Sequence, residues 1–429
     1  MATLSEELHA RGLIHQVTDA AILGKLDAGG VTAYAGFDPT ADSLHVGHLL
    51  QVCTLRRLQL AGNRPIALAG GGTGMIGDPG GKASERPLLS VEEITANVEA
   101  IRGQLSRFLD FEASAGDARA LLLDNAEWLA PMHALAFLRE VGKHFTVNQM
   151  VAKESVRSRL ERPDQGISYT EFSYMLLQAY DFARLAEDHG CSLQIGGSDQ
   201  WGNITMGIEL VHKRGLGEAF GLTSPLVTKA DGTKFGKSEA GNEQVWLDAS
   251  RTSPYRLYQF MLTAEDAVVG NYLRYFTFLD LAEIEALDVE TADHPSARAA
   301  QRALAAAVVA LVHGDEDRRR AEAASAALFG GELAALDQRT LADLIGEVPS
   351  SNWTRAALAE RPLLVDVLSG TSLAMSKSDA RRTIEQGGAF VNDEARSGID
   401  SVIGPEDLLH DRYVVLRRGK RSYHLLDLT

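Results

Sequence analysis

Apolar positions in the first third of the chain follow two alternating patterns. Short apolar runs at residues 31–37, 66–69 and 121–124 predict buried strands, whereas residues 47–61 and 90–108 carry apolar side chains at helical spacing. Strands that alternate with helices predict a parallel sheet that has helices on both faces and ligands at the carboxyl ends of its strands. We therefore expect an α/β fold.

Two helices begin with the signal of a capping box, in which a serine precedes a glutamate by three residues. These pairs are Ser90 with Glu93 and Ser168 with Glu171. Residues 250–350 are rich in alanine and leucine and have a mostly helical pattern. The alternating region is therefore expected to be followed by a helical one.

The helix that starts after Ser168 carries polar residues on one face. Tyr174, Gln178 and Asp181 are spaced i, i+4 and i+7, so their side chains point the same way. A phenol, an amide and a carboxylate need polar partners if they are buried. This face predicts a ligand site, and a solvated helix face is the alternative.

The junction between the strand at 31–37 and the helix at 47–61 is a candidate nucleotide site. Backbone N–H groups and the positive end of the helix dipole favour anions at a helix N-terminus. His45 and His48 flank Gly47, whose missing side chain would let a flat base approach the backbone. The alternative is an ordinary turn with two surface histidines.

A glycine-rich loop follows the strand at 66–69. Residues 72–77 match the G-x-G-x-x-G pattern of dinucleotide enzymes, but the helix-breaking residues 78–81 (DPGG) follow where that pattern needs a helix. A P-loop is excluded, because Ile76 and Asp231 occupy the positions where its first glycine is required. A dinucleotide enzyme remains a minor alternative.

Composition and length indicate a globular protein of two or three domains, with 429 residues of which 45% are hydrophobic. No apolar run approaches the roughly 18 residues of a membrane span, and the N-terminus lacks a signal-peptide pattern. Cys53 and Cys191 cannot form a disulfide framework, which fits a reducing compartment. We expect a cytoplasmic protein with no membrane segment.

The net charge of −16 argues against a nucleic-acid partner, but the charge is unevenly distributed. Residues 353–429 contain 11 Lys and Arg and 11 Asp and Glu, so the acidic excess lies upstream. The basic run at 417–421 suits phosphate contacts, with a solvated charge cluster as the alternative.

Two signature motifs point to a family. GFDPTADSLHVGH (residues 36–48) resembles the HIGH signature of class I aminoacyl-tRNA synthetases, and KFGKS (234–238) is similar to their KMSKS loop. MLLQAYDF (175–182) and LQIGGSDQWGN (193–203) extend the similarity. Over nearly its whole length, the chain resembles the bacterial tyrosyl-tRNA synthetases.

The resemblance implies a domain organisation. A Rossmann-like parallel-sheet catalytic domain is expected at residues 1–248 and a helical anticodon-binding domain at 249–346. A linker at 347–361 and a small alpha-L RNA-binding domain at 362–429 are expected to follow.

The resemblance also implies the reaction. The carboxylate of L-tyrosine would attack the α-phosphate of ATP to give tyrosyl-adenylate and pyrophosphate, and the tyrosyl group would pass to the 3′ end of tRNA(Tyr). Mg²⁺ would accompany ATP, with no metal held by the protein alone and no prosthetic group. A homodimer is expected, with an interface that includes Met132, Leu135, Phe137, Leu138 and Phe145.

The resemblance assigns residues to three roles. Catalytic contacts to the phosphates fall on Thr40, His45, His48, Lys82, Arg86, Lys234 and Lys237. Tyrosine contacts fall on Tyr34 and Asp181 at the phenolic hydroxyl, Asp78, Tyr174 and Gln178 at the ammonium, and Gln200 near the carboxylate. Contacts to ATP fall on Gly36, Asp38, Gly47, Gly197, Asp199 and Lys237.

A second KMSKS-like segment, AMSKS at residues 374–378, lacks the first lysine and lies in a different part of the chain. The stretch around it resembles an RNA-binding module of a ribosomal protein. This similarity assigns RNA contacts to the cations Lys377, Arg381, Arg382, Arg417 and Arg418.

Two alternatives remain. A non-catalytic RNA-binding relative would not need Thr40, His45 and His48. A tryptophan-specific synthetase would have no hydroxyl to offer to Tyr34 and Asp181. The roles of Gln51 and Ala35 stay open.

Overall fold

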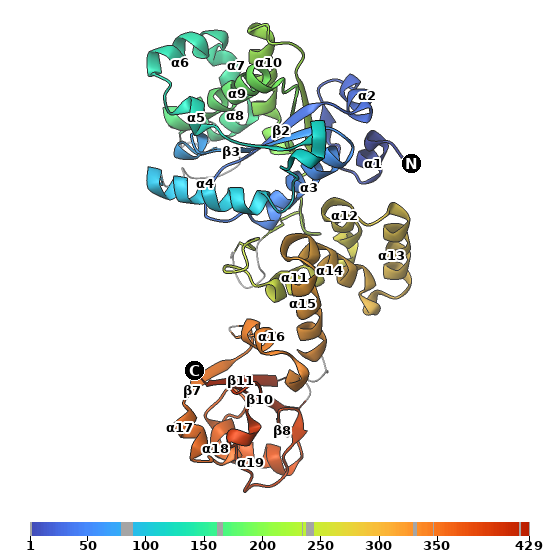
Figure 1. Ribbon diagram of the computed structural model, residues 1–429, viewed down its shortest axis with the longest axis vertical. Helices are drawn as coiled ribbons and strands as arrows, with labels where there is room; N and C mark the ends of the chain where they lie inside the picture. The colour runs from blue at the N-terminus through green and yellow to red at the C-terminus, as the bar shows by residue number, and fades with distance from the viewer. Residues whose placement is uncertain are drawn as a thin grey trace. The chain divides into compact units, whose positions relative to one another are not determined.

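The computed structural model describes residues 2–78, 89–160, 166–233, 235–236, 244–328, 333–345, 347–419 and 422–428. The chain forms two compact units (Figure 1). The first unit contains Met1–Arg251 and Ala264–Leu304, and the second contains Thr252–Thr263 and Ala305–Thr429.

The first unit is built on a sheet with the strand order β1-β6-β5-β2-β3-β4. All neighbouring strands are parallel except β1, which is antiparallel to β6. The strands are β1 (Gln16–Val17), β2 (Thr32–Phe37), β3 (Arg64–Ala69), β4 (Leu121–Asp124), β5 (Leu193–Gly197) and β6 (Phe220–Ser224). The predicted α/β fold with a parallel sheet is confirmed.

The strand order places a crevice at one edge of this sheet. From β2 the chain moves to one side through β3 and β4, and it then returns to β5 and β6 on the other side. In parallel sheets, ligands bind at such a switch point, outside the carboxyl ends of the strands. The candidate site is therefore expected beyond the ends of β2 and β5.

Helices cover both faces of the sheet (Figure 1). The first helices of this unit in chain order are α1 (Leu4–Ala10), α2 (Ala21–Ala28), α3 (Val46–Leu60), α4 (Val91–Leu105), α5 (Ala126–Leu129), α6 (Ala134–Glu140), α7 (Val147–Val151) and α8 (Glu154–Leu160). They are followed by α9 (Tyr169–His189), α10 (Trp201–Lys213), α12 (Asp266–Phe276), α13 (Leu281–Asp293) and α14 (Ala299–His313), of which α14 continues into the second unit.

The two predicted capping boxes differ in outcome. Ser90 and Glu93 form a complete box at the start of α4. At α9, the Ser168 hydroxyl accepts from the Glu171 N–H, but the Glu171 carboxylate is buried and pairs with Arg159 at 2.9 Å. The side chain that would have closed the second box therefore holds α8 against α9 instead.

The second unit contains a smaller sheet in the order β7-β11-β10-β8-β9. Its strands are β7 (Ser350–Trp353), β8 (Ala389–Val391), β9 (Glu394–Ala395), β10 (Tyr413–Arg418) and β11 (Ser422–Leu428). Its helices are α11 (Pro254–Leu262), α15 (Asp315–Leu328), α16 (Gln338–Asp343), α17 (Arg355–Ala359), α18 (Leu364–Ser369) and α19 (Lys377–Glu385).

This smaller sheet buries both of its faces. Val414 and Leu416 of β10 join the core formed with α18 and α19, whereas Tyr413 and Val415 join a core with α15 and α16. Successive side chains of a strand point to opposite faces, which explains the alternation.

The stretch predicted as a linker, residues 347–361, is partly built into this sheet. Residues 350–353 form β7, which pairs in parallel with β11, and residues 355–359 form α17. The linker was predicted because this stretch contains proline and polar residues. The same residues are tolerated in a short strand at the edge of a sheet, which is where β7 lies.

Candidate active site

A cavity of about 860 Å³ lies beyond the carboxyl ends of β2 and β5. It brings together every described residue that the sequence assigned to the phosphates, tyrosine or ATP: Tyr34, Gly36, Asp38, Thr40, His45, Gly47, His48, Asp78, Tyr174, Gln178, Asp181, Gly197, Asp199 and Gln200. Ala35 and Gln51 also line it. Lys82, Arg86, Lys234 and Lys237 lie outside the described residues.

The two histidines stand at the N-terminus of α3. The His45 ring caps this helix, because its Nδ1 accepts from the Gly47 N–H at 3.1 Å. His48 Nδ1 accepts from the His45 N–H at 3.2 Å, and the two rings stack with centroids 3.8 Å apart. An imidazole that accepts at Nδ1 carries its proton on Nε2 when neutral. Both rings can therefore donate from Nε2.

Gly47 is required by this arrangement for a reason that the sequence did not indicate. A Cβ at this position would lie 2.8 Å from the His45 ring. The missing side chain makes room for the imidazole that caps the helix, and the predicted approach of a base at Gly47 stays a prediction.

A short backbone pairing joins the two signature motifs. The Val46 N–H donates to Val245 O at 3.1 Å, and the Leu247 N–H donates to Leu44 O at 2.8 Å. Trp246 lies between these partners and lines the cavity, with its ring 6.2 Å from that of His45. The segment just after the KFGKS motif is thus held against the entrance to α3.

One end of the cavity is buried and carries Tyr34 and Asp181. The Tyr34 side chain is 1% exposed, and its hydroxyl has no hydrogen-bond partner among the described residues. Asp181 accepts from Asn125 Nδ2 at 2.9 Å and from Trp128 Nε1 at 2.7 Å. Burial raises the pKa of Asp181 to about 7, although the two hydrogen bonds act in the opposite direction.

Asn125 and Trp128 were not predicted from the sequence. Asn125 follows directly after β4, at the same edge of the sheet as the predicted residues. Its position after a predicted strand is the feature of the sequence that could have identified it as a site residue. Nothing in the local pattern around Trp128 distinguishes it from a core aromatic.

A second cluster of polar side chains includes Tyr174 and Asp38. The Tyr174 hydroxyl donates to Asp38 Oδ2 at 2.8 Å, and burial raises the pKa of Tyr174 well above its usual value. Gln200 Nε2 donates to Asp78 Oδ2 at 2.8 Å, and Gln178 Nε2 donates to Gln200 Oε1 at 3.3 Å. Acceptors and amides that are far apart in sequence therefore converge on one region of the cavity.

The glycine loop does not have the geometry of a dinucleotide fingerprint. Residues Thr73–Met75 form one 3₁₀ turn, and no helix opens from the glycines within the described residues up to 78. The glycine loop therefore no longer supports a dinucleotide-binding enzyme.

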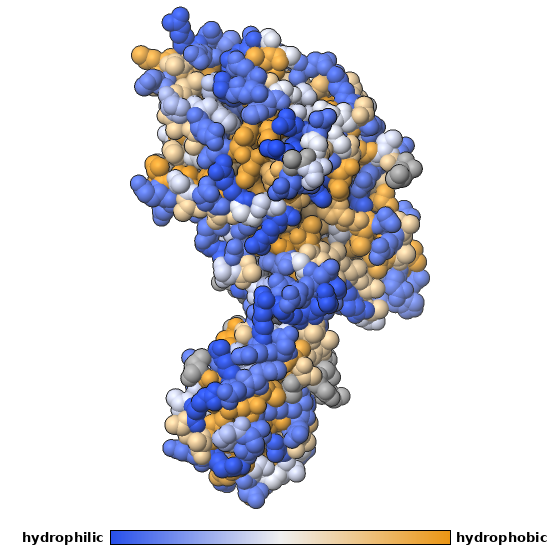
Figure 2. All heavy atoms as spheres, in the orientation of Figure 1, coloured by the Kyte–Doolittle hydropathy of each residue, from blue (hydrophilic) through white to orange (hydrophobic). Residues whose placement is uncertain are grey.

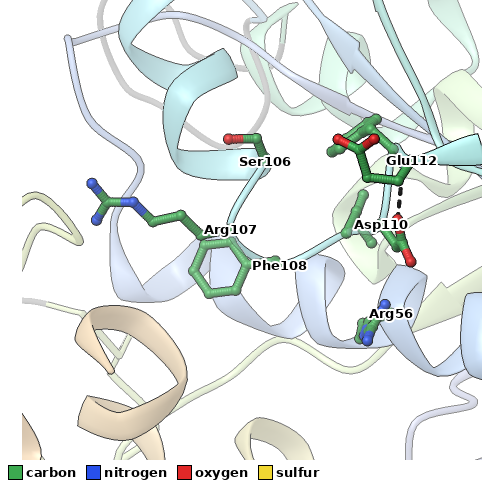
Figure 3. A pocket seen from close by; sticks show the side chains of 8 residues that line it. Arg56, Ser106, Arg107, Phe108, Asp110 and Glu112 are labelled. Atoms are coloured by element: carbon green, nitrogen blue, oxygen red, sulfur yellow. Dashed lines mark hydrogen bonds between the residues drawn. The ribbon is translucent and has the colours of Figure 1, made fainter. Parts of the chain in front are cut away.

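Another pocket, of about 370 Å³, lies beside the C-terminal end of α4 (Figure 3). Arg56, Arg107, Asp110 and Glu112 are among its lining residues. It contains none of the residues that were predicted for the site, so we do not assign chemistry to it.

The predicted RNA-binding cations fall into two groups. Lys377, Arg381 and Arg382 lie on α19 and are exposed, although Lys377 pairs with Asp366 at 2.6 Å and Arg382 with Asp379 at 3.0 Å. Arg418 pairs with Asp379 at 2.7 Å, and Arg417 covers the Phe390 ring at 3.7 Å. Arg417 and Arg418 therefore also hold the domain together.

Within the described part of the chain, no helix is long and apolar enough to cross a membrane. No group of three or more His, Cys, Asp and Glu side chains there could hold a metal ion. Cys53 and Cys191 are buried and unpaired.

Comparisons with known proteins agree with one another. Residues 27–330 match the family model described as tRNA synthetases class I (W and Y), and residues 340–426 match the tyrosine–tRNA ligase SYY-like C-terminal domain. The tyrosine–tRNA ligase of Roseiflexus castenholzii is 55% identical over 429 residues, which is 100% of both chains. That of Geobacillus stearothermophilus is 51% identical over 425 residues, or 99% of each chain.

A solved structure shares the fold. The C-terminally truncated mitochondrial tyrosyl-tRNA synthetase of Aspergillus nidulans has a TM-score of 0.68 and 33% identity. The match covers 77% of this chain and 95% of that one.

Proposed function

Because the chain belongs to the class I tRNA synthetases for tryptophan and tyrosine, we propose roles in tyrosine activation for the residues that its cavity brings together. The chain activates L-tyrosine with ATP and transfers the tyrosyl group to tRNA(Tyr), the reaction named for its full-length relatives. The single observation that favours tyrosine in the cavity is the buried Tyr34 hydroxyl, which has no partner among the described residues.

Tyr34 and Asp181 recognise the phenolic hydroxyl. Burial keeps the Tyr34 hydroxyl protonated by raising its pKa, so it can donate to the substrate oxygen. Asn125 and Trp128 orient Asp181, whose carboxylate accepts a hydrogen bond from the substrate hydroxyl. A buried hydroxyl left unpaired is costly, which disfavours phenylalanine and tryptophan in this site.

Asp78, Tyr174 and Gln178 hold the ammonium, and Gln200 lies near the carboxylate. The Tyr174 hydroxyl donates its hydrogen to Asp38, so the hydroxyl oxygen can accept a hydrogen bond from an ammonium. Gln200 donates to Asp78 and accepts from Gln178, which supports a position of its amide next to the two ammonium-binding residues.

The ATP side uses donors rather than a nucleophile. The tyrosine carboxylate forms the bond to the α-phosphorus while the bond to pyrophosphate breaks, and charge grows on the leaving oxygens. His45 and His48 donate from Nε2 and Thr40 from its hydroxyl, while Lys82, Arg86, Lys234 and Lys237 supply cations. Gly36, Gly47, Gly197, Asp38 and Asp199 surround the nucleotide. Mg²⁺ accompanies ATP, since it prefers phosphate oxygens and water.

In the second step, a ribose hydroxyl at the 3′ end of tRNA attacks the carbonyl carbon of tyrosyl-adenylate, and AMP leaves. We place the enzyme in the cytoplasm, where ATP and tRNA are its substrates and where reducing conditions suit two free cysteines.

ATP–pyrophosphate exchange with each of the twenty amino acids tests this function. Tyrosine alone should support exchange. Exchange with tryptophan would favour the sister specificity, and no exchange with any amino acid would favour a non-catalytic RNA-binding relative.

Tyrosine affinity should depend on pH through Asp181. Burial raises the pKa of the Asp181 carboxyl to about 7. The proposed hydrogen bond from the substrate hydroxyl needs the ionised carboxylate as acceptor. Below pH 7 a proton must leave before binding, so the Kd for tyrosine should rise by up to about tenfold for each unit of pH. Equilibrium dialysis between pH 8 and pH 5.5 measures this, and a flat Kd would contradict the proposed role.

Homodimerisation is proposed through the surface of α6, α7 and α8. Leu135 is 82% exposed, and Leu138, Val147, Val151 and Leu160 are exposed on the same helices. Figure 2 shows apolar side chains at the molecular surface where α6 lies, at the upper left of the view. Exposed apolar patches of this kind mark interfaces.

The structure corrects part of the expected interface. Phe145 belongs to the core beneath these helices, and Met132 and Phe137 pack against that core. Phe145 is therefore a core residue of one subunit, Met132 and Phe137 are partly buried, and Leu135 and Leu138 are exposed.

We expect Leu135→Asp to produce monomers, because it places a charge in the proposed interface. Val289 on α13 is a matched control, since it is 62% exposed but lies on a different helix of the same unit. Sedimentation velocity measures the outcome. A dimeric Leu135→Asp variant, or dissociation by Val289→Asp as well, would argue against this surface.

The exposed face of α19 is proposed to contact tRNA phosphates. Arg381→Ala should weaken tRNA binding and lower the slope of log K against log salt by about one, with pyrophosphate exchange unchanged. Arg355→Ala is the control, because Arg355 is an exposed arginine of the same unit that is bound to Asp411. Equal losses in both variants would contradict a specific role of α19.

A further inference from the structure

A line of hydrogen bonds connects Asp181 with Asp38 beneath the cavity. Asn125 Nδ2 donates to Asp181 Oδ2 at 2.9 Å and to Thr73 Oγ1 at 2.9 Å. Thr73 Oγ1 donates to Asp38 Oδ1 at 2.8 Å. Asp181 lies on α9, Asn125 after β4 and Asp38 after β2, so the line ties three elements together.

The direction of each hydrogen bond follows from chemistry. Asn125 Oδ1 accepts from the backbone N–H groups of Gly72, at 2.7 Å, and Thr73, at 3.3 Å. The amide nitrogen must then face Asp181 and Thr73. Because Thr73 Oγ1 accepts from that nitrogen, its own proton points to Asp38.

The surroundings leave Asp38 and Thr73 little freedom. Thr73 and Asn125 are buried, and a Cβ on Gly70 would lie 2.3 Å from Asp38 Oδ1 and 2.6 Å from Thr73 Oγ1. The second oxygen of Asp38 accepts from the Tyr174 hydroxyl. Each oxygen of the carboxylate therefore has a side-chain donor, Thr73 at Oδ1 and Tyr174 at Oδ2.

We propose that Thr73 is a positioning residue that sets the Asp38 carboxylate, and through it the Tyr174 hydroxyl, at a fixed distance from the phenol end of the cavity. This deepens the proposed function and rests on it. Asp38 and Tyr174 serve the ammonium and nucleotide side, so an error in their position should appear in the rate of adenylate formation. The phenol end should keep its affinity for tyrosine, because the backbone N–H groups of Gly72 and Thr73 still hold the Asn125 amide. Trp128 also donates to Asp181 without involving the Thr73 hydroxyl.

Thr73→Val keeps the shape and removes the hydroxyl. We expect the kcat of tyrosine-dependent pyrophosphate exchange to fall about tenfold or more, because Asn125 loses an acceptor and Asp38 a donor, while the KM for tyrosine changes less than about threefold. Thr73→Ser should restore the rate. Thr223→Val is the control, because Thr223 is a buried threonine of β6 in the same unit and its hydroxyl has no partner among the described residues.

A double-mutant cycle separates positioning from a general packing effect. If Thr73 acts through Asp38, Thr73→Val should have little further effect in the Asp38→Asn variant. An equal factor in both backgrounds would overturn the proposal. So would a wild-type rate for Thr73→Val, or a Thr73→Ser variant as slow as Thr73→Val.

A crystal structure of Thr73→Val tests the positioning without reference to activity. The Asp38 carboxylate should turn away from its place beside Tyr174, and an unmoved carboxylate would overturn the proposal. Absence of tyrosine-dependent exchange in the unaltered protein would instead overturn the proposed function, which distinguishes the two failures.

Discussion

Replacing His45 by alanine should slow tyrosyl-adenylate formation by about 10²- to 10³-fold while the Kd for tyrosine stays nearly constant. Loss of one donor that is preorganised for growing negative charge typically has an effect of this size. The ring lies at the N-terminus of α3 and its Nδ1 accepts from the Gly47 N–H, so the neutral ring carries its proton on Nε2. The substitution removes contacts to the leaving phosphates and none of those proposed for tyrosine.

The helix cap must be separated from this effect, because His45 also caps α3. His45→Asn is the matched variant, since asparagine is a favourable N-cap residue but has no group in the position of Nε2. Both variants should be slow in pre-steady-state measurements, and only His45→Ala should also be less stable. A weakened tyrosine Kd with an unchanged rate would rule out the role.

Replacing Tyr34 by phenylalanine should weaken discrimination between tyrosine and phenylalanine by about 5- to 150-fold. The variant has no buried hydroxyl to leave unpaired, and this penalty is of order 1–3 kcal/mol. In the structure, the Tyr34 hydroxyl is buried and lacks a hydrogen-bond partner among the described residues, so its removal breaks no hydrogen bond with them.

Pyrophosphate exchange with both amino acids gives the ratio of their kcat/KM values. Tyr413→Phe is the control, because Tyr413 is a buried tyrosine of the second unit whose hydroxyl also lacks a partner among the described residues. Unchanged discrimination in Tyr34→Phe would show that this hydroxyl does not meet the substrate. An equal change in Tyr413→Phe would indicate an effect on folding.

Some features of the chain follow from local patterns in the sequence. Short apolar runs, which are typical of strands buried on both faces, predicted the strands β2, β3 and β4. Helical spacing and capping signals predicted the helices α3, α4 and α9. The same spacing placed Tyr174, Gln178 and Asp181 on one face of α9. The motif around His45, the glycine loop and the segment at residues 193–203 supplied the rest of the predicted cavity through the family resemblance.

Other features depend on which strands are neighbours, and spacing within an element carries no information about that. Asn125 reaches Asp181 because β4 and α9 meet at the same edge of the sheet, although 56 residues separate them. Trp246 reaches His45 by a backbone pairing between distant segments. Sequence reasoning could not find either partner.

The sequence by itself determined the alternating α/β pattern and the residue types of the cavity, since both are written in local periodicity and motifs. The tertiary structure alone decided which polar groups satisfy one another and which apolar residues remain exposed. Phe145 and Leu135 were both expected at the interface, yet the first is buried in the core and the second is exposed. The physical reason is that burial and hydrogen bonding depend on what lies across the contact, and the partner is set by chain topology.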